Sequence, residues 1–455
     1  MKYIRLLFLF FLTVPVVFSQ SEPDSELPPA KTTEALQLET IRYGTESEIA
    51  VLIQTLKNEN AFYLDDELIT LVQSAKNRII LSGVFSFFGD RGKGGLEERA
   101  IRAVKERDNE AFETVVSALD YLGKIKAPDA IGPLKDVIDR DEQRFMGNAV
   151  RALGLVGKVD AETADSTAEY FVDFYTNRNP GDENRREMVL ALGELGSLEG
   201  IPLLSEIAGS GDERPALRMA ALDSLSKIGA PEGLQTILTA LVSPDPNVRS
   251  SAIAALGPFS GQEVEDVILD AFRDSYYRAR ISAAKAAGER KFVEAIPYLR
   301  YRAEKDEIPA VKDEAIRALG AMGNRDADTI LADLLMERKN TDRVRILAAE
   351  MLIRNNADDY AGKVILEMDE AQGKKQTVLY NGFLRVIGTA RSGTVEDLTR
   401  RFLTSGGIIE KSYALDMTVN NEFRDLAPQV KELTDEKNGT LARKARNVLE
   451  KLGLD

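Results

Sequence analysis

The sequence predicts an all-α solenoid, because one short pattern returns at nearly constant spacing along most of its 455 residues. The pattern is clearest at residues 246–257, which read P-N-V-R-S-S-A-I-A-A-L-G. Its last apolar residue recurs every 31 to 39 residues, at Phe88, Leu122, Leu153, Leu192, Leu225, Leu256, Ala287, Leu319, Leu352 and Leu384, with a further copy at Leu449. A fixed period of this length is typical of stacked helical pairs, each stable only against its neighbours.

Each repeat is expected to contain two helices. In the second helix, Val248, Ala252 and Leu256 are four residues apart, so they lie along one stripe of a helix. The first helix has proline near its start, as at Pro202 and Pro297, where a missing backbone N–H is tolerated. We therefore expect helices throughout and predict no strands.

These features together resemble the HEAT repeat: proline near the start of the first helix, a turn with Asp, and a second helix running from Val-Arg-x-x-Ala to Leu-Gly. The short period resembles the bilin-lyase-type subgroup, and the resemblance covers Ile79 to Leu454. It implies an all-α, right-handed superhelical solenoid of about 11–12 HEAT-like helical pairs. Because such solenoids mostly present surfaces to partners, it also implies a scaffold that binds a protein or peptide on its concave face, which the second helices line in HEAT solenoids. A bilin-lyase-like enzyme or chaperone of the same repeat family remains the alternative, which bound pigment would reveal.

Four segments are expected along the chain: a signal peptide at 1–19, a flexible linker at 20–33, an irregular helical N-terminal cap at 34–78, and the HEAT-like repeat solenoid with a C-terminal capping helix at 79–455. Residues 1–19 begin with Lys2 and Arg5, continue with an apolar run and end with small residues at Val17 and Ser19. This is the pattern of a secretory signal peptide. Its cleavage would leave no membrane span and place the protein in a bacterial periplasm or outside the cell, whereas an uncleaved anchor is the alternative.

The composition excludes several function classes. The chain carries a net charge of −15 and contains no His, Cys or Trp. Without His and Cys it lacks the commonest general base, thiol nucleophiles and the usual zinc ligands, and it cannot form the His-Glu iron site of deoxyhypusine hydroxylase, which has similar repeats. The acidic balance opposes nucleic acid as a partner, and with it a DNA-glycosylase-like solenoid. We expect a protein that is not an enzyme, with no catalytic residues, cofactor or metal.

A cation occupies the same position of six consecutive repeats, seven residues before the apolar anchor. These residues, which we call the cation ladder, are Arg185, Arg218, Arg249, Arg280, Lys312 and Arg345. The favoured interpretation is structural: each cation caps the turn between helices and bonds an Asp of its own or the adjacent repeat, with Asp212, Asp274 and Asp306 six residues before three of them. The alternative is a basic stripe that binds an acidic ligand.

The candidate partner-binding face follows from helical geometry. At 100° per residue, the position after the ladder cation and the position four residues further lie opposite the core stripe. The residues there are Arg186 and Leu190, Met219 and Asp223, Ser250 and Ala254, Ile281 and Lys285, Asp313 and Arg317, and Ile346 and Glu350. Apolar residues among mixed charges suit a groove for a peptide or helix. The alternative is that Met219, Ile281 and Ile346 pack against the second helix of the adjacent repeat.

Overall fold

The structure is a computed structural model that describes residues 32–140, 143–178 and 180–454. The predicted signal peptide and most of the predicted linker lie outside these residues. The described chain is built from helices joined by turns, and no strand occurs in it, which confirms the all-α prediction. Contacts divide the chain into two units, with the boundary between Phe87 and Phe88.

The first unit contains α1 (Thr33–Tyr43), α2 (Glu46–Glu59), α3 (Asp65–Ser74) and most of α4 (Arg78–Gly89). Helix α2 begins with a capping box, because Thr45 accepts from the N–H of Glu48 and the Glu48 side chain accepts from the N–H of Thr45. Such a box satisfies two helix-end donors at once. The apolar side of α2, which includes Leu52 and Leu56, is buried.

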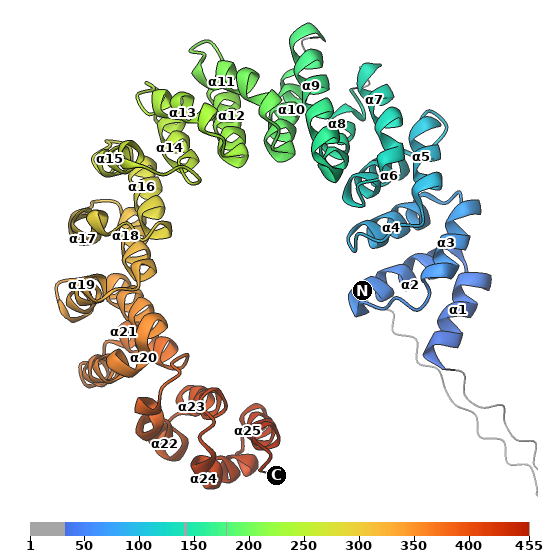
Figure 1. Ribbon diagram of the computed structural model, residues 1–455. Helices are drawn as coiled ribbons and strands as arrows, with labels where there is room; N and C mark the ends of the chain where they lie inside the picture. Colours follow the sequence, from blue (N-terminus) through green and yellow to red (C-terminus); the bar gives the residue numbers. More distant parts are fainter. Residues whose placement is uncertain (1–31, 141–142, 179, 455) are drawn as a thin grey trace, which may run out of the picture. The chain divides into compact units, whose positions relative to one another are not determined.

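The second unit is a row of eleven helical pairs (Figure 1). In chain order the pairs are α5 (Glu97–Lys105) and α6 (Phe112–Lys124), α7 (Ile131–Asp139) and α8 (Met146–Val156), α9 (Ala161–Arg178) and α10 (Asp182–Leu195), α11 (Ile201–Gly209) and α12 (Pro215–Ile228), α13 (Leu234–Ala240) and α14 (Pro246–Ala255), α15 (Gln262–Ala271) and α16 (Tyr277–Glu289), α17 (Ile296–Lys305) and α18 (Pro309–Met322), α19 (Arg325–Met336) and the first part of α20 (Asp342–Gly373), the rest of α20 and α21 (Thr377–Ile387), α22 (Glu396–Ser405) and α23 (Ile408–Asn420), and α24 (Ala427–Glu432) and α25 (Gly439–Leu452). Short 3-10 turns precede several of the first helices, as at Pro231–Gly233 before α13.

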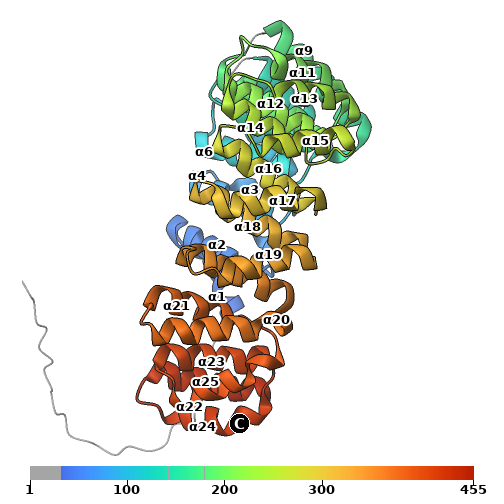
Figure 2. The ribbon, with the colours of Figure 1, turned by 90° about the vertical axis from the view of Figure 1, so that its left-hand side faces the viewer.

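Two kinds of contact hold the row together. Each first helix packs on its own second helix, and each second helix packs on the next, as α12 does on α14 and α16 on α18. Figure 2 shows the later pairs as successive layers. We call the solvent-facing side of the second helices the second-helix face. The side of the row that the first helices form is called the first-helix side.

The glycine after the apolar anchor explains how closely the second helices approach. A Cβ atom on Gly288 would lie 2.8 Å from Cα of Ala318, and one on Gly193 would lie 2.6 Å from Cα of Ser224. Real Cβ atoms do not tolerate such distances, so glycine is required at these two contacts between second helices. At Gly193 and Gly288 the glycine of the repeat is therefore a packing element rather than part of a turn.

One repeat boundary lacks a separate turn. Helix α20 runs from Asp342 to Gly373, but Asn356 within it has φ −155° and ψ 86°, which interrupts the helical path. The Asn356 side chain then accepts from the N–H of Asp359 at 3.2 Å and starts the next helical segment as a cap. The repeat period is kept across this break, because Leu352 and Leu384 remain 32 residues apart.

Candidate partner-binding surfaces

The cation ladder lies where the first and second helices of each repeat join. Most of its cations donate to backbone carbonyls at the end of the first helix or in the following turn: Arg218 Nε to Ala208 at 3.0 Å, Arg249 Nη1 to Ser243 at 2.9 Å, Arg280 Nη1 to Asp274 at 2.9 Å, Lys312 Nζ to Glu304 at 3.0 Å and Arg345 Nε to Leu335 at 2.8 Å. These carbonyls lie at helix ends, where no intrahelical donor reaches them. Five of the six ladder cations thus cap the end of the first helix in their own repeat, whereas Arg185 Nε donates to the Tyr175 hydroxyl at 2.9 Å.

Four ladder cations also pair with a carboxylate further along the chain. Arg249 bonds Asp274 and Arg280 bonds Asp306, each through two nitrogens, while Arg185 pairs with Glu213 and Arg345 with Glu367. In these four pairs the carboxylate comes from a later segment of the chain and not from the Asp six residues before the cation. For Arg280 that earlier Asp is Asp274, which contributes its backbone carbonyl. For Arg218, the acceptor is Ala208 rather than the expected Asp212.

These pairs shift the acidity of their carboxyl groups. The pKa of Asp274 is lowered by hydrogen bonds from Arg249, which outweigh the opposing effect of burial. Burial raises the pKa of Asp306, but hydrogen bonds from Arg280 and from the N–H of Ile308, with the charges of Arg280 and Arg302, bring it below its ordinary value. Both carboxylates therefore stay ionised well below neutral pH.

The predicted partner-binding residues differ in their exposure to solvent. Arg186, Asp223, Ala254, Lys285 and Arg317 are exposed, whereas Leu190, Met219, Ser250, Ile281, Ile346 and Glu350 are half-buried. Asp313 is buried, since the exposed side chain of Arg343 covers it and its Nε lies 2.8 Å from Oδ2 of Asp313. A partner that binds at this position would therefore contact Arg343 and not Asp313.

Two of the half-buried positions touch the next second helix. Ser250 Oγ lies 3.2 Å from Ser282 Oγ in α16. Ile346 fills the space beside Gly382 of α21, where a Cβ atom would collide with its side chain. At these two positions the side chains take part in packing between repeats. A partner can therefore contact mainly the exposed residues of the predicted face, most of which are charged.

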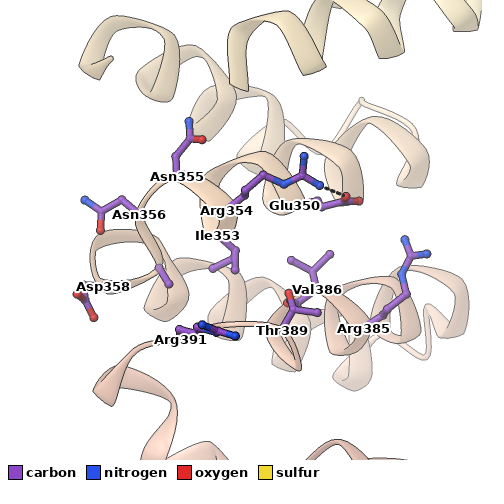
Figure 3. A pocket seen from close by; sticks show the side chains of 11 residues that line it. Glu350, Ile353, Arg354, Asn355, Asn356, Asp358, Arg385, Val386, Thr389 and Arg391 are labelled. Carbon is purple, nitrogen blue, oxygen red and sulfur yellow. Dashed lines mark hydrogen bonds and ion pairs between the residues drawn. The ribbon is translucent and has the colours of Figure 1, made fainter. Parts of the chain in front are cut away.

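A cleft of about 700 Å³ lies at the C-terminal ends of two consecutive second helices (Figure 3). Figure 3 shows Arg354 and Glu350 on its upper side, Asn356 and Asp358 at one end, and Arg385 and Arg391 below. The buried residues Ile353 and Val386 add apolar surface to its wall. Its lining comes from both sides of the Asn356 break and from the end of α21.

The charges of this cleft are only partly matched. Arg354 pairs with Glu350 at 3.1 Å, whereas Arg385 and Arg391 are exposed and have no ion-pair partner within the described part of the chain. Guanidinium groups bind carboxylates in a two-pronged geometry, so the cleft can hold an acidic group beside an apolar wall. Of the residues predicted for the partner-binding face, Glu350 lines it. Sequence reasoning missed Arg385 and Arg391 because they follow the core anchor Leu384, outside the helical positions considered.

The described part of the chain offers little for other chemistry. None of its Asp and Glu residues form a group of three or more that could hold a metal ion. Among the helices that the structure describes, none combines the length and apolar character needed to cross a membrane.

Paired helices in register, stacked through their second helices, define a HEAT-repeat solenoid. More particularly, the chain belongs to the family described as Spirochaete HEAT repeat protein, whose sequence profile matches residues 41–448. No curated protein matches it significantly in sequence.

Solved structures of similar fold include importin-β proteins and karyopherins. Yeast importin-β (Kap95p) is 12% identical, with a TM-score of 0.57 over 93% of this chain and 67% of that one. The karyopherin Kap121p, solved with the extreme C-terminus of the protein phosphatase Cdc14p, is 13% identical, with a TM-score of 0.48 over 92% of this chain and 54% of that one. This chain thus spans about half the length of Kap121p. At such identities the likeness concerns the fold alone.

Proposed function

We propose that this protein is an exported scaffold without enzymatic activity that binds a protein or peptide partner along its second-helix face. The cleft at the Asn356 break of α20 and the C-terminal end of α21 carries the proposal, because it combines an apolar wall with Arg385 and Arg391, whose charges the described chain leaves unmatched. A partner segment with a carboxylate next to an apolar side chain would satisfy both features. The exposed residues Asp223, Lys285 and Arg317 extend the same face over earlier repeats.

The location is proposed from the leader sequence. Lys2, Arg5, the apolar run and the small residues before Gln20 support export to a bacterial periplasm or outside the cell, and the family's description as spirochaete supports a bacterial source. Intact mass of protein from the native host tests this, with a mature chain that starts at or near Gln20 as the expected result. A mass that includes residues 1–19 would contradict cleavage.

The absence of activity is proposed from the composition. A chain without His and Cys lacks the side chains that most often act as general base or nucleophile at neutral pH. A colourless purified protein would agree with this proposal, whereas a bound pigment would favour the bilin-lyase-like alternative.

Site-directed photocrosslinking in the native cell envelope tests the binding face. A photoreactive amino acid replaces Thr389, an exposed residue that lines the cleft. The matched control replaces Thr329, an exposed threonine of the first helix α19. We expect one defined protein partner, identified by mass spectrometry, from position 389 and not from position 329. Equal products from both positions, or none from 389, would contradict the proposed face.

A further inference from the structure

One segment of this acidic protein has the opposite charge. Residues 271–305 carry nine Lys or Arg side chains against four Asp or Glu, a net charge of +5 in a chain whose total is −15. The same segment contains four tyrosines: Tyr276, Tyr277, Tyr298 and Tyr301. The rest of the chain therefore carries −20, and this basic, tyrosine-rich segment stands apart from it electrostatically.

The structure gathers part of this segment into a groove on the first-helix side. Two adjoining hollows of about 400 and 520 Å³ share Arg273, which follows α15, and Tyr301 and Arg302 of α17. The first is completed by Pro297 and Tyr298. The second continues past Lys305 to Asp306 and Glu307, and Asp274 also lines it. We call the two together the tyrosine–arginine groove.

Arginine and tyrosine side chains are already stacked in this groove. The guanidinium of Arg273 lies 5.3 Å from the ring centre of Tyr298, whose hydroxyl accepts from its Nη2 at 3.3 Å. The guanidinium of Arg302 lies 5.2 Å from the ring centre of Tyr301 and also reaches Asp306 at 3.2 Å. Stacking restrains each guanidinium before a ligand arrives and so reduces the entropy lost on binding.

The exposed members of the groove, Arg273, Tyr301 and Lys305, lie outside the packed core. The Tyr301 side chain is 58% exposed although it is aromatic. Lys305 is exposed and has no ion-pair partner among the described residues. Among the described residues, Arg273 forms an ion pair with Asp270, three residues earlier on the surface, at 3.1 Å, beside its contact with Tyr298. By contrast, Arg280 of the cation ladder borders the groove but is engaged with Asp306.

We propose that the tyrosine–arginine groove binds a short acidic segment of a protein partner, with an apolar or aromatic side chain of that segment against Tyr298 and Tyr301. Charge complementarity supports this occupant, because carboxylates would meet Arg273, Arg302 and Lys305 while the acidic remainder of the chain repels anions elsewhere. A nucleic acid fits less well, since a long polyanion would extend from the groove onto that acidic surface. The groove is separate from the second-helix face, so this proposal does not depend on the proposed function.

Fluorescence anisotropy of a defined probe tests the groove in the full chain. The probe is a fluorescein-labelled peptide of repeated Glu-Glu-Phe units, compared with the same peptide in which Gln replaces Glu. The groove variant combines Arg273→Gln, Tyr301→Ser and Lys305→Gln, and the control combines Arg325→Gln, Tyr43→Ser and Lys105→Gln, which make the same changes at other exposed sites. Melting curves establish that both variants fold.

We expect the acidic peptide to bind at low salt, to weaken as salt rises, and to lose about tenfold or more in affinity with the groove variant but not with the control. No binding of the acidic peptide, equal binding of its Gln form, or equal loss in both variants would overturn the proposal. Tighter, groove-dependent binding of an oligothymidine probe would assign the groove to nucleic acid instead. Dimerisation that the groove variant abolishes, seen by sedimentation, would assign it to a second copy of the chain.

Discussion

Arg280 and Asp306 join consecutive repeats through two parallel hydrogen bonds, with Nε 2.8 Å from Oδ2 and Nη2 2.9 Å from Oδ1. The third nitrogen of Arg280, Nη1, donates to the carbonyl of Asp274 in the turn of its own repeat at 2.9 Å. The two side chains are 11% and 1% exposed. One arginine thus closes a turn and fixes a buried carboxylate of the next repeat, and its loss would leave Asp306 without its main partner.

Replacing Arg280 by Gln is expected to lower the free energy of unfolding by about 1 to 3 kcal/mol, because buried acceptors lose their donors. Urea denaturation followed by circular dichroism measures the change. The control is Arg278→Gln, since Arg278 is exposed two residues earlier and should change stability by less than about 0.5 kcal/mol. Equal effects of the two substitutions would mean that the pair contributes nothing beyond a surface charge.

The same pair predicts a pH dependence. The pKa of Asp306 is below its ordinary value in the folded protein, so the unfolded chain binds this proton more readily. Its stabilisation is complete above the unfolded pKa of about 3.9 and is lost as the pH falls through the lower folded value. We expect the stability difference between wild type and Arg280→Gln to stay constant from neutral pH to about pH 5 and to shrink below about pH 4. Urea titrations at stepped pH measure it, and a difference that grows on acidification would refute the assignment.

Gly288→Ala is expected to destabilise the protein by about 1 to 3 kcal/mol, the cost of forcing an atom into a packed core. The added Cβ would lie 2.8 Å from Cα of Ala318. The control is Gly362→Ala in α20, where no atom lies within 4 Å of the added Cβ and where Ala should stabilise the helix by about 0.5 to 1 kcal/mol. Thermal melting distinguishes the two, and the same sign for both would refute the close-packing role of Gly288.

The repeat register was predictable because core packing is periodic. Leu122, Leu192 and Leu319, chosen from spacing alone, are all fully buried, and the all-α solenoid follows from that regularity. The break at Asn356 was not predictable from turn residues, since N-N-A-D-D contains neither Gly nor Pro. The backbone of one asparagine and its capping side chain replace the turn there.

The surfaces were harder to predict, because helical angle alone does not measure how far a neighbouring helix reaches. Ile346 points away from its own core stripe, yet it packs beside Gly382 of the next second helix. Asp313 occupies a predicted surface position but is covered by Arg343, which comes from the next repeat. For Arg280 the sequence left open an Asp of its own or of the adjacent repeat, and the stacking of repeats selects Asp306 of the adjacent one.

Leu256→Ala is expected to lower the free energy of unfolding by about 2 to 5 kcal/mol, because it removes a core anchor and leaves a cavity. Leu256 is fully buried directly after α14. The control is Val242→Ala in the same repeat, where the side chain is 82% exposed and the change should be close to zero. An unaltered unfolding curve for Leu256→Ala would show that the assigned register is wrong.

Charge reversal in the cleft, Arg385→Glu with Arg391→Glu, is expected to abolish the crosslinked partner obtained from position 389. Both side chains are exposed, so the fold should persist, whereas a partner carboxylate would meet like charge in place of a guanidinium. The matched control is Arg325→Glu with Arg424→Glu, two exposed arginines outside the cleft, which imposes the same change in net charge. Melting curves check folding, and crosslinking in the native envelope measures capture. Retained capture in the cleft variant, or equal loss in the control, would show that the partner does not depend on these arginines and would place its binding site elsewhere on the solenoid.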